Sequence, residues 1–174
     1  KPHKKVFNLR NLVNAALYIL NPEIFDFIDK SVFSDFGKDI FPKVLHKRKL
    51  ISAYNTSEYI KDIGTPSRLL EVEKDFLSGK VQLRNKINKQ KAIFLDRDGV
   101  INQELERINK IDKFNLLPNV IESVKNINQS DFLNVVVTNQ PIVAKGFISE
   151  KKLGEIHNYM ETKLGSKGAY FNRI

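Results

Sequence analysis

The 174-residue chain contains no cysteine. This absence excludes disulfide bridges and any metal site with cysteine ligands within these residues, and it fits a reducing compartment. The three histidines are scattered along the chain, and none has a partner at metal-ligand spacing. We therefore interpret His3, His46 and His157 as structural or solvated residues.

Long apolar runs are also missing. No stretch approaches the roughly 20 residues needed to cross a bilayer, and no signal-peptide pattern is visible. The first residue is Lys1 rather than methionine, and the opening residues resemble the middle of a domain. We expect a cytoplasmic protein with no membrane partner.

Acidic residues are scarce in the first half of the chain. The net charge is +9, and residues 1–90 hold 17 basic against 10 acidic residues, whereas residues 91–174 hold 12 against 10. A basic surface favours anionic partners such as nucleic acids or sugar phosphates. Because no basic and aromatic nucleic-acid motif accompanies the charge, we interpret it as a solvated face and expect no nucleic-acid partner.

Apolar residues are sufficient for a folded core, at 41% of the chain with 12 phenylalanines. We expect buried strands at residues 12–20 and 49–54, which are rich in apolar and β-branched residues. Asn21-Pro22-Glu23 has the order of a helix start, with an N-cap, a proline and an acid. A further helix is expected between the N-cap Thr65 and Ser78-Gly79.

Residues 80–91 contain five basic residues, no acid and few apolar residues. We predict a linker at residues 80–90, between one unit at residues 1–79 and another at residues 91–174. The alternative is a basic helix packed on a neighbouring domain.

The second unit is predicted to be a parallel α/β sheet. Strands are expected at residues 93–95, at residues 131–137 and from Ala169 onward, and two helices alternate with them. The first helix begins near Pro118, and the second is capped by Ser149. Strand, helix, strand, helix, strand at this spacing is typical of parallel sheets.

Polar residues follow the first two of these strands. Asp96 and Asp98 stand one residue apart before Gly99, and Thr138 and Asn139 follow the second strand. Ligands bind at the carboxyl ends of strands in doubly wound sheets. The alternative for each group is ordinary turn chemistry, but two complementary groups in one unit favour a site.

These residue types suit the hydrolysis of a phosphate ester. Asp96 would attack phosphorus and form an aspartyl-phosphate, while Asp98 would protonate the leaving oxygen and later activate water. Thr138 would bind a phosphate oxygen and Asn139 would position it. A divalent metal is needed to neutralise the charges of the carboxylate and the phosphate.

Asp96-Arg97-Asp98-Gly99-Val100-Ile101-Asn102 and Val137-Thr138-Asn139-Gln140 resemble motifs of the haloacid dehalogenase (HAD) phosphatases. Within that superfamily the chain is most similar to the histidinol-phosphatase and D-glycero-D-manno-heptose 1,7-bisphosphate phosphatase group, whose loops also match residues 114–118 and 144–147. The resemblance covers residues 91–174. It implies a HAD-like Rossmannoid parallel sheet.

The resemblance further implies Mg²⁺ held by Asp96 and by the backbone carbonyl of Asp98, with Thr138 and Asn139 on the transferring phosphate. The family's third and fourth motifs, a basic residue and a further metal-binding aspartate, are not found in these residues. The group's Cys/His zinc loop is not found either, so activity of these residues alone is in question.

The first unit resembles a different family. Lys1-Pro2, residues 13–19 and Asp62-Ile63-Gly64-Thr65-Pro66 are similar to the second half of sugar-1-phosphate nucleotidyltransferases, with Ala16 in place of the family's glycine. The resemblance implies that Lys1 contacts the sugar phosphate and Asn14 the sugar, and that Asp62 helps hold Mg²⁺. The family's glycine-rich loop would precede Lys1, so nucleotide transfer by this half alone is not expected.

Our leading hypothesis is a bifunctional enzyme of nucleotide-heptose biosynthesis. Its phosphatase would act on a phosphorylated sugar, heptose 1,7-bisphosphate, and its transferase would use a nucleoside triphosphate in the full-length protein. A first alternative is a nucleotidyltransferase (guanylyl transfer to mannose- or heptose-1-phosphate) with a vestigial HAD part. A second is a non-catalytic basic protein that binds nucleic acid through residues 80–91.

Overall fold

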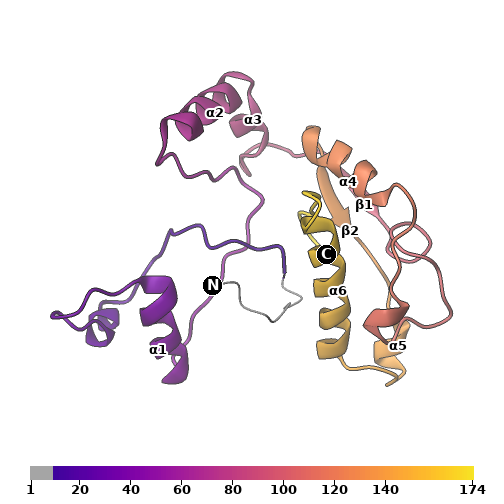
Figure 1. Ribbon diagram of the computed structural model, residues 1–174, viewed down its shortest axis with the longest axis horizontal. Helices are drawn as coiled ribbons and strands as arrows, with labels where there is room; N and C mark the ends of the chain where they lie inside the picture. Colours follow the sequence, from indigo (N-terminus) through magenta and orange to yellow (C-terminus); the bar gives the residue numbers. More distant parts are fainter. Residues whose placement is uncertain (1–9) are drawn as a thin grey trace. The chain divides into compact units, whose positions relative to one another are not determined.

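The computed structural model describes residues 10–174, which form two compact units (Figure 1). Residues 14–56 form the smaller unit, and the larger unit comprises the described residues 10–13 together with residues 57–174. The smaller unit holds the 3₁₀-helix η1 (Pro22–Phe27), the π-helical turn η2 (Phe36–Ile40) and the helix α1 (Phe41–His46). The larger unit holds, in order, α2 (Pro66–Leu77), α3 (Lys80–Leu83), β1 (Ala92–Leu95), η3 (Ile111–Lys113), α4 (Val120–Gln129), β2 (Leu133–Val136), α5 (Pro141–Ala144) and α6 (Glu150–Gly165).

The prediction of a strand at residues 12–20 is wrong. This segment is irregular, and Leu17 and Ile19 are 85% and 103% exposed. Tyr18 is the residue that packs, with its ring centroid 4.9 Å from that of Phe41. A strand needs a hydrogen-bonded neighbour, and no strand among the described residues pairs with this segment. Its backbone also enters the left-handed region at Ala16, where φ is 55°.

The strand predicted at residues 49–54 is absent for the same reason, and Leu50 is 90% exposed. The helix start at Asn21 is confirmed, because its side chain accepts a hydrogen bond from the Glu23 N–H, although the helix is a single 3₁₀ segment. The buried apolar side chains of this unit are those of Ile40 and Val44, and the rings of Phe36 and Phe41 pack with their centroids 5.7 Å apart.

Helix α2 begins as predicted. The side chain of Thr65 accepts a hydrogen bond from the N–H of Arg68, and Pro66 is the first helical residue. Gly79, with φ of 79°, ends the helix. The predicted linker contains α3, and beyond it Arg84 places Nη2 3.4 Å from the carbonyl oxygen of Ser130. The domain boundary at residues 80–90 stays a prediction.

The parallel α/β sheet is confirmed. β1 pairs with β2 in parallel, with Leu95 opposite Val136, and α4 provides the crossover between them (Figure 1). The third strand forms only in part, since Val135 makes a single parallel bridge with Arg173. β1 is less buried than predicted, because Phe94 is 69% exposed.

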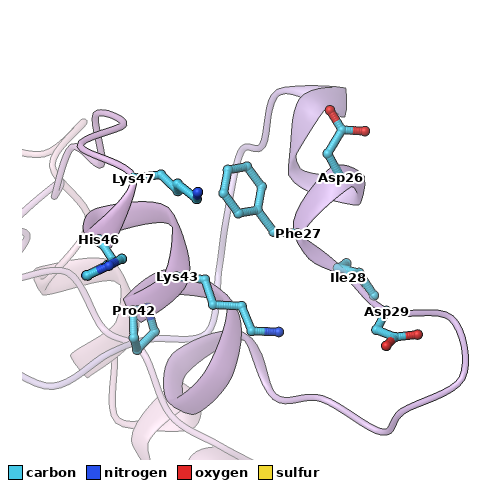
Figure 2. A pocket seen from close by; sticks show the side chains of 8 residues that line it. All are labelled: Asp26, Phe27, Ile28, Asp29, Pro42, Lys43, His46 and Lys47. Carbon is cyan, nitrogen blue, oxygen red and sulfur yellow. The ribbon is translucent and has the colours of Figure 1, made fainter.

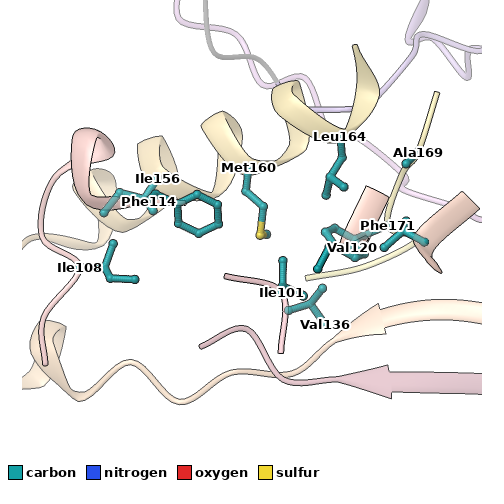
Figure 3. Packing of buried hydrophobic residues seen from close by; sticks show 11 residues of the cluster. Ile101, Ile108, Phe114, Val120, Val136, Ile156, Met160, Leu164, Ala169 and Phe171 are labelled. Carbon is teal, nitrogen blue, oxygen red and sulfur yellow. The ribbon is translucent and has the colours of Figure 1, made fainter. Parts of the chain in front are cut away.

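The core of the larger unit lies between α6 and the sheet (Figure 3). Ile156, Met160 and Leu164 recur every four residues on α6, and all three are fully buried. Each such side chain stabilises the fold by about 1.5–3 kcal/mol through burial. Helix α6 starts at its predicted cap, where Ser149 accepts a hydrogen bond from Lys152. This packing fixes α6 against the strands and their carboxyl ends.

Among residues 10–174, each helix is too short or too polar to cross a bilayer.

Candidate active site

The carboxyl ends of β1 and β2 lie side by side. Leu95 and Val136 are opposite each other, and the Val137 N–H donates a hydrogen bond of 2.8 Å to the Leu95 carbonyl. Asp96 therefore leaves β1 at the same edge at which Thr138 leaves β2. The structure brings together the two groups of polar residues in the sequence motifs.

A tight loop follows β1. The Asn102 N–H donates to the Arg97 carbonyl at 3.0 Å, and the Gly99 N–H donates to the Asn102 carbonyl at 2.8 Å. Gly99 has a φ of 76°, a conformation that glycine adopts without strain. The loop leaves Asp96 exposed at the strand end, where its Oδ1 accepts a hydrogen bond from the Arg97 N–H.

The Asp98 carboxylate is held by three side chains. Arg97 donates to it through Nε and Nη2, Asn102 donates to Oδ1 at 2.8 Å, and the Gln140 amide donates to Oδ2 at 2.7 Å. Burial acts to raise the pKa of Asp98, but the hydrogen bonds and the Arg97 charge outweigh it and hold the pKa below its usual value. Asp98 is therefore ionised at neutral pH.

Gln140 joins the two strand ends. Its Nε2 donates both to Asp98 Oδ2 and, at 2.8 Å, to Thr138 Oγ1, while its Oε1 accepts from Arg97 Nη2 at 2.7 Å. The side chain thus contacts one polar residue of each predicted group and the arginine between the two aspartates.

Arg97 is a buried cation, 1% exposed. Its Nη1 lies 3.3 Å from Nε2 of His157, which projects from α6. Burial, together with the positive charges of Arg97 and Arg10, lowers the pKa of His157 to about 4, so the ring is neutral at pH 7. Because Arg97 can only donate, Nε2 accepts and the ring proton sits on Nδ1.

Sequence reasoning missed the roles of Arg97, Asn102, Gln140 and His157. The first three lie in the motifs, but their side-chain directions depend on the loop geometry. His157 was interpreted as structural or solvated, and it is the structural interpretation that fits. Its spacing of three residues from Met160 and seven from Leu164, both on the buried face of α6, was the available signal.

The other predicted site residues lie apart from this network. Asn139 is exposed beside Thr138. Asn14, in the smaller unit, accepts hydrogen bonds from the Ala16 N–H and the Tyr18 hydroxyl. Asp62, in the larger unit, is exposed and pairs with Arg68. Lys1 lies outside the described residues.

The two strand ends offer few protein ligands for a metal ion. Within residues 10–174, no three His, Cys, Asp or Glu side chains gather as a metal cage. Mg²⁺ commonly takes only one or two protein carboxylates and completes its shell with water and substrate phosphate. The exposed Asp96 carboxylate and the neighbouring Asp98 carbonyl fit such a shell.

The smaller unit has a groove of its own (Figure 2). Side chains of η1 and the residues after it line one side, and side chains of α1 with Lys47 line the other: Asp26, Phe27, Ile28, Asp29, Pro42, Lys43 and His46. None of the predicted site residues lines this groove.

Comparison with known proteins identifies two relationships. Residues 1–79 match the family model of nucleotidyl transferases. An 85-residue stretch, 49% of this chain, is 35% identical to the D-glycero-β-D-manno-heptose-1,7-bisphosphate 7-phosphatase of Pasteurella multocida and covers 46% of it. A stretch of 81 residues, 47% of this chain, is 37% identical to the D-glycero-α-D-manno-heptose-1,7-bisphosphate 7-phosphatase of Photorhabdus laumondii. The match covers 44% of that protein. Both resemblances are confirmed.

The chain therefore combines a segment that matches the nucleotidyl transferase model with a segment that is similar to heptose bisphosphate phosphatases. It spans about half the length of the phosphatases it matches. Among solved structures, the D,D-heptose 1,7-bisphosphate phosphatase of B. bronchiseptica, complexed with magnesium and phosphate, is 32% identical. The match covers 49% of this chain and 48% of that one, with a TM-score of 0.47.

Proposed function

We propose that the protein carrying this chain is a Mg²⁺-dependent phosphatase of a sugar bisphosphate, fused to a sugar-1-phosphate nucleotidyltransferase. The observation that carries the proposal is the joining of Asp98 and Thr138 by Gln140 beside the exposed Asp96. This arrangement at adjacent strand ends supports the assignment of Asp96 as nucleophile, Asp98 as acid–base group and Thr138 as phosphate ligand.

In the first step, an Asp96 carboxylate oxygen attacks phosphorus and the bond from phosphorus to the sugar oxygen breaks. Asp98 gives a proton to the leaving sugar oxygen. Asp98 is ionised in the free protein, and the negative charge of the arriving phosphate raises its proton affinity, so that it takes this proton from solvent. The product is an aspartyl-phosphate on Asp96.

In the second step, water attacks the phosphorus of the aspartyl-phosphate. Asp98, now ionised, accepts the proton from this water, and the bond between phosphorus and Asp96 breaks. Inorganic phosphate leaves, and Asp96 is regenerated as a carboxylate. The hydrogen bonds that favour ionised Asp98 support its role as the base in this step.

Asp96 and the Asp98 carbonyl are the residues that would hold Mg²⁺. When bound, the ion offsets the repulsion between the carboxylate and the phosphate dianion. Thr138 would donate its hydroxyl proton to a phosphate oxygen, and Asn139 would orient the same group. Further metal ligands outside the described residues would complete the site.

The substrate we propose is D-glycero-D-manno-heptose 1,7-bisphosphate, which is supported by the names of the relatives. The nucleotidyltransferase part would then attach a nucleotide from a nucleoside triphosphate to a heptose phosphate. Lys1 and Asn14 would contact the sugar phosphate, and Asp62 would hold Mg²⁺ at the pyrophosphate. Because nucleoside triphosphates are cytoplasmic metabolites, we place the protein in the cytoplasm.

A second candidate function is nucleotidyl transfer as the main activity, which the match of residues 1–79 favours. Guanylyl transfer to heptose-1-phosphate by the full-length protein tests it. Loss of transfer in Asp62→Ala with unchanged phosphate release would assign the two activities to separate sites.

Phosphate release from heptose 1,7-bisphosphate tests the leading proposal. The full-length protein that contains this sequence should release phosphate with Mg²⁺ and stop with a chelator. Asp96→Asn should lower the rate by at least about a thousandfold because the covalent step is lost. Asp131→Asn, an exposed aspartate before β2, is the charge-matched control. No release by the unmodified protein would refute the function, and equal rates in Asp96→Asn would refute the nucleophile.

A further inference from the structure

Gln140 has a fixed orientation at the junction of the two strand ends. Its two Nε2 protons are both used, one on Asp98 and one on Thr138, and its Oε1 accepts from the arginine. In the reversed orientation the amide protons would face the N–H groups of Arg97, and the carbonyl would face a carboxylate. Both contacts would be repulsive, so the surrounding charges select one orientation.

This orientation sets the direction of the Thr138 hydroxyl. Thr138 Oγ1 accepts a proton from Gln140, which leaves the hydroxyl's own proton to be donated elsewhere. A phosphate oxygen is an acceptor only, so a hydroxyl that already accepts from the protein is oriented to donate to it.

We infer that Gln140 is a positioning residue that makes Thr138 a proton donor toward the phosphate while holding Asp98 in place. This inference rests on the proposed function. Gln140 touches neither the transferred group nor the metal in this account. It acts through Thr138, which would bind the phosphate, and through Asp98, which would exchange protons with the leaving group and with water. Its amide group holds these two side chains at a fixed separation.

The neighbouring geometry supports this role. Pro141 starts α5 directly after Gln140, which fixes the backbone at this point, and Gln140 is itself the residue before the helix. On its far side Arg97 is buried and contacted by His157, so the acceptor Oε1 of Gln140 meets a cation that cannot move into solvent.

Gln140→Glu is the discriminating variant, because it preserves size and the acceptor for Arg97. Glutamate has no amide proton, so Thr138 would donate to it instead of to phosphate, and its charge would repel Asp98. Gln129→Glu, at an exposed position at the end of α4, makes the same change in charge away from the site. Circular dichroism and thermal unfolding of both variants establish that they fold.

Binding of inorganic phosphate in the presence of Mg²⁺, measured by calorimetry on the full-length protein, is the first readout. Gln140→Glu should weaken phosphate binding by about tenfold to a hundredfold, the range for one hydrogen bond to a charged group. Its KM for the bisphosphate should rise and its kcat should fall, whereas Gln129→Glu should match the unmodified protein. Equal phosphate binding and KM in a folded Gln140→Glu would overturn the inference.

The second readout needs no activity. In NMR spectra of the full-length protein, Thr138→Val should shift the side-chain amide proton of Gln140 that loses its acceptor, and it should leave the amide protons of Gln129 unchanged. If the unmodified protein binds no inorganic phosphate and releases none from the bisphosphate while this shift is seen, the proposed function fails and the hydrogen bond between Gln140 and Thr138 stands. Gln140 amide protons that do not respond to Thr138→Val would overturn the inference itself.

Discussion

The guanidinium of Arg97 binds the carboxylate of Asp98, its neighbour in the sequence, with Nη2 2.9 Å from Oδ2. The arginine is buried and the aspartate is 28% exposed. An ion pair between adjacent residues requires the backbone to turn so that both side chains point the same way, and the loop closed on the Arg97 carbonyl provides this turn. The pair places the buried positive charge of Arg97 next to Asp98, the proposed acid–base group.

Removal of the arginine should destabilise the larger unit. We expect Arg97→Met to lower the free energy of unfolding by about 3 kcal/mol, because Asp98 is left partly buried without its cation. Arg107→Met, at an exposed arginine paired with Glu106, should cost less than about 1 kcal/mol. Urea denaturation at pH 7 measures both. Similar values for the two variants would contradict the structural role of Arg97.

The lowered pKa of Asp98 predicts a dependence of stability on pH. A carboxyl whose pKa is lower in the folded state stabilises the protein above its unfolded pKa of about 4, and this contribution disappears as the pH falls through the folded pKa. The unmodified protein should therefore exceed Asp98→Asn in unfolding free energy at pH 7, and the gap should close on acidification. Urea denaturation from pH 7 to pH 3 measures the gap, with Asp131→Asn as the exposed control. A gap that widens toward low pH would contradict the prediction.

His157 should also make the protein less stable as the pH falls, but over a different pH range from Asp98. Its folded pKa of about 4 lies below the usual value of 6.5, so the unfolded chain binds the proton more readily between these values. Stability should fall as the pH drops from 6.5 to 4, by up to about 3 kcal/mol. His157→Gln should remove this part of the slope, and His46→Gln, at an exposed residue of the smaller unit, should retain it. An NMR titration that finds the imidazole half protonated near pH 6.5 would show the ring to be solvated instead.

Replacement of Ala16 by glycine should raise the stability of the smaller unit. Its φ of 55° lies in the left-handed region, which costs an L-residue about 1–2 kcal/mol. Allowing for the greater flexibility of glycine when unfolded, Ala16→Gly should stabilise the smaller unit by about 1 kcal/mol. Hydrogen exchange of residues 36–46 should slow by about fivefold. Ala15→Gly, which lacks the positive φ, should speed exchange.

The sequence predicted the elements that carry their own local signals. Helices α2 and α6 begin at Thr65 and Ser149 because each side chain caps the N–H three residues on, and β1 ends where two aspartates and a glycine force a turn. These signals need only neighbouring residues.

Features that depend on distant partners were not predictable in this way. Residues 12–20 have the composition of a strand, yet no described strand pairs with them, and composition cannot reveal that. The same holds for Gln140 and His157, which lie 42 and 60 residues from their partners Asp98 and Arg97. Their roles emerge only when two strand ends and α6 are brought together.

The central claim is that Asp96 is the nucleophile of a phosphatase site. It is tested most directly by acid quenching of the full-length protein during turnover of the sugar bisphosphate with Mg²⁺, followed by mass spectrometry of its peptides. We predict a phosphoryl group on Asp96 in the unmodified protein and none at this position in Asp96→Asn. Steady turnover without any phosphoryl group on Asp96, or a phosphoryl group on another residue of both proteins, would contradict the account.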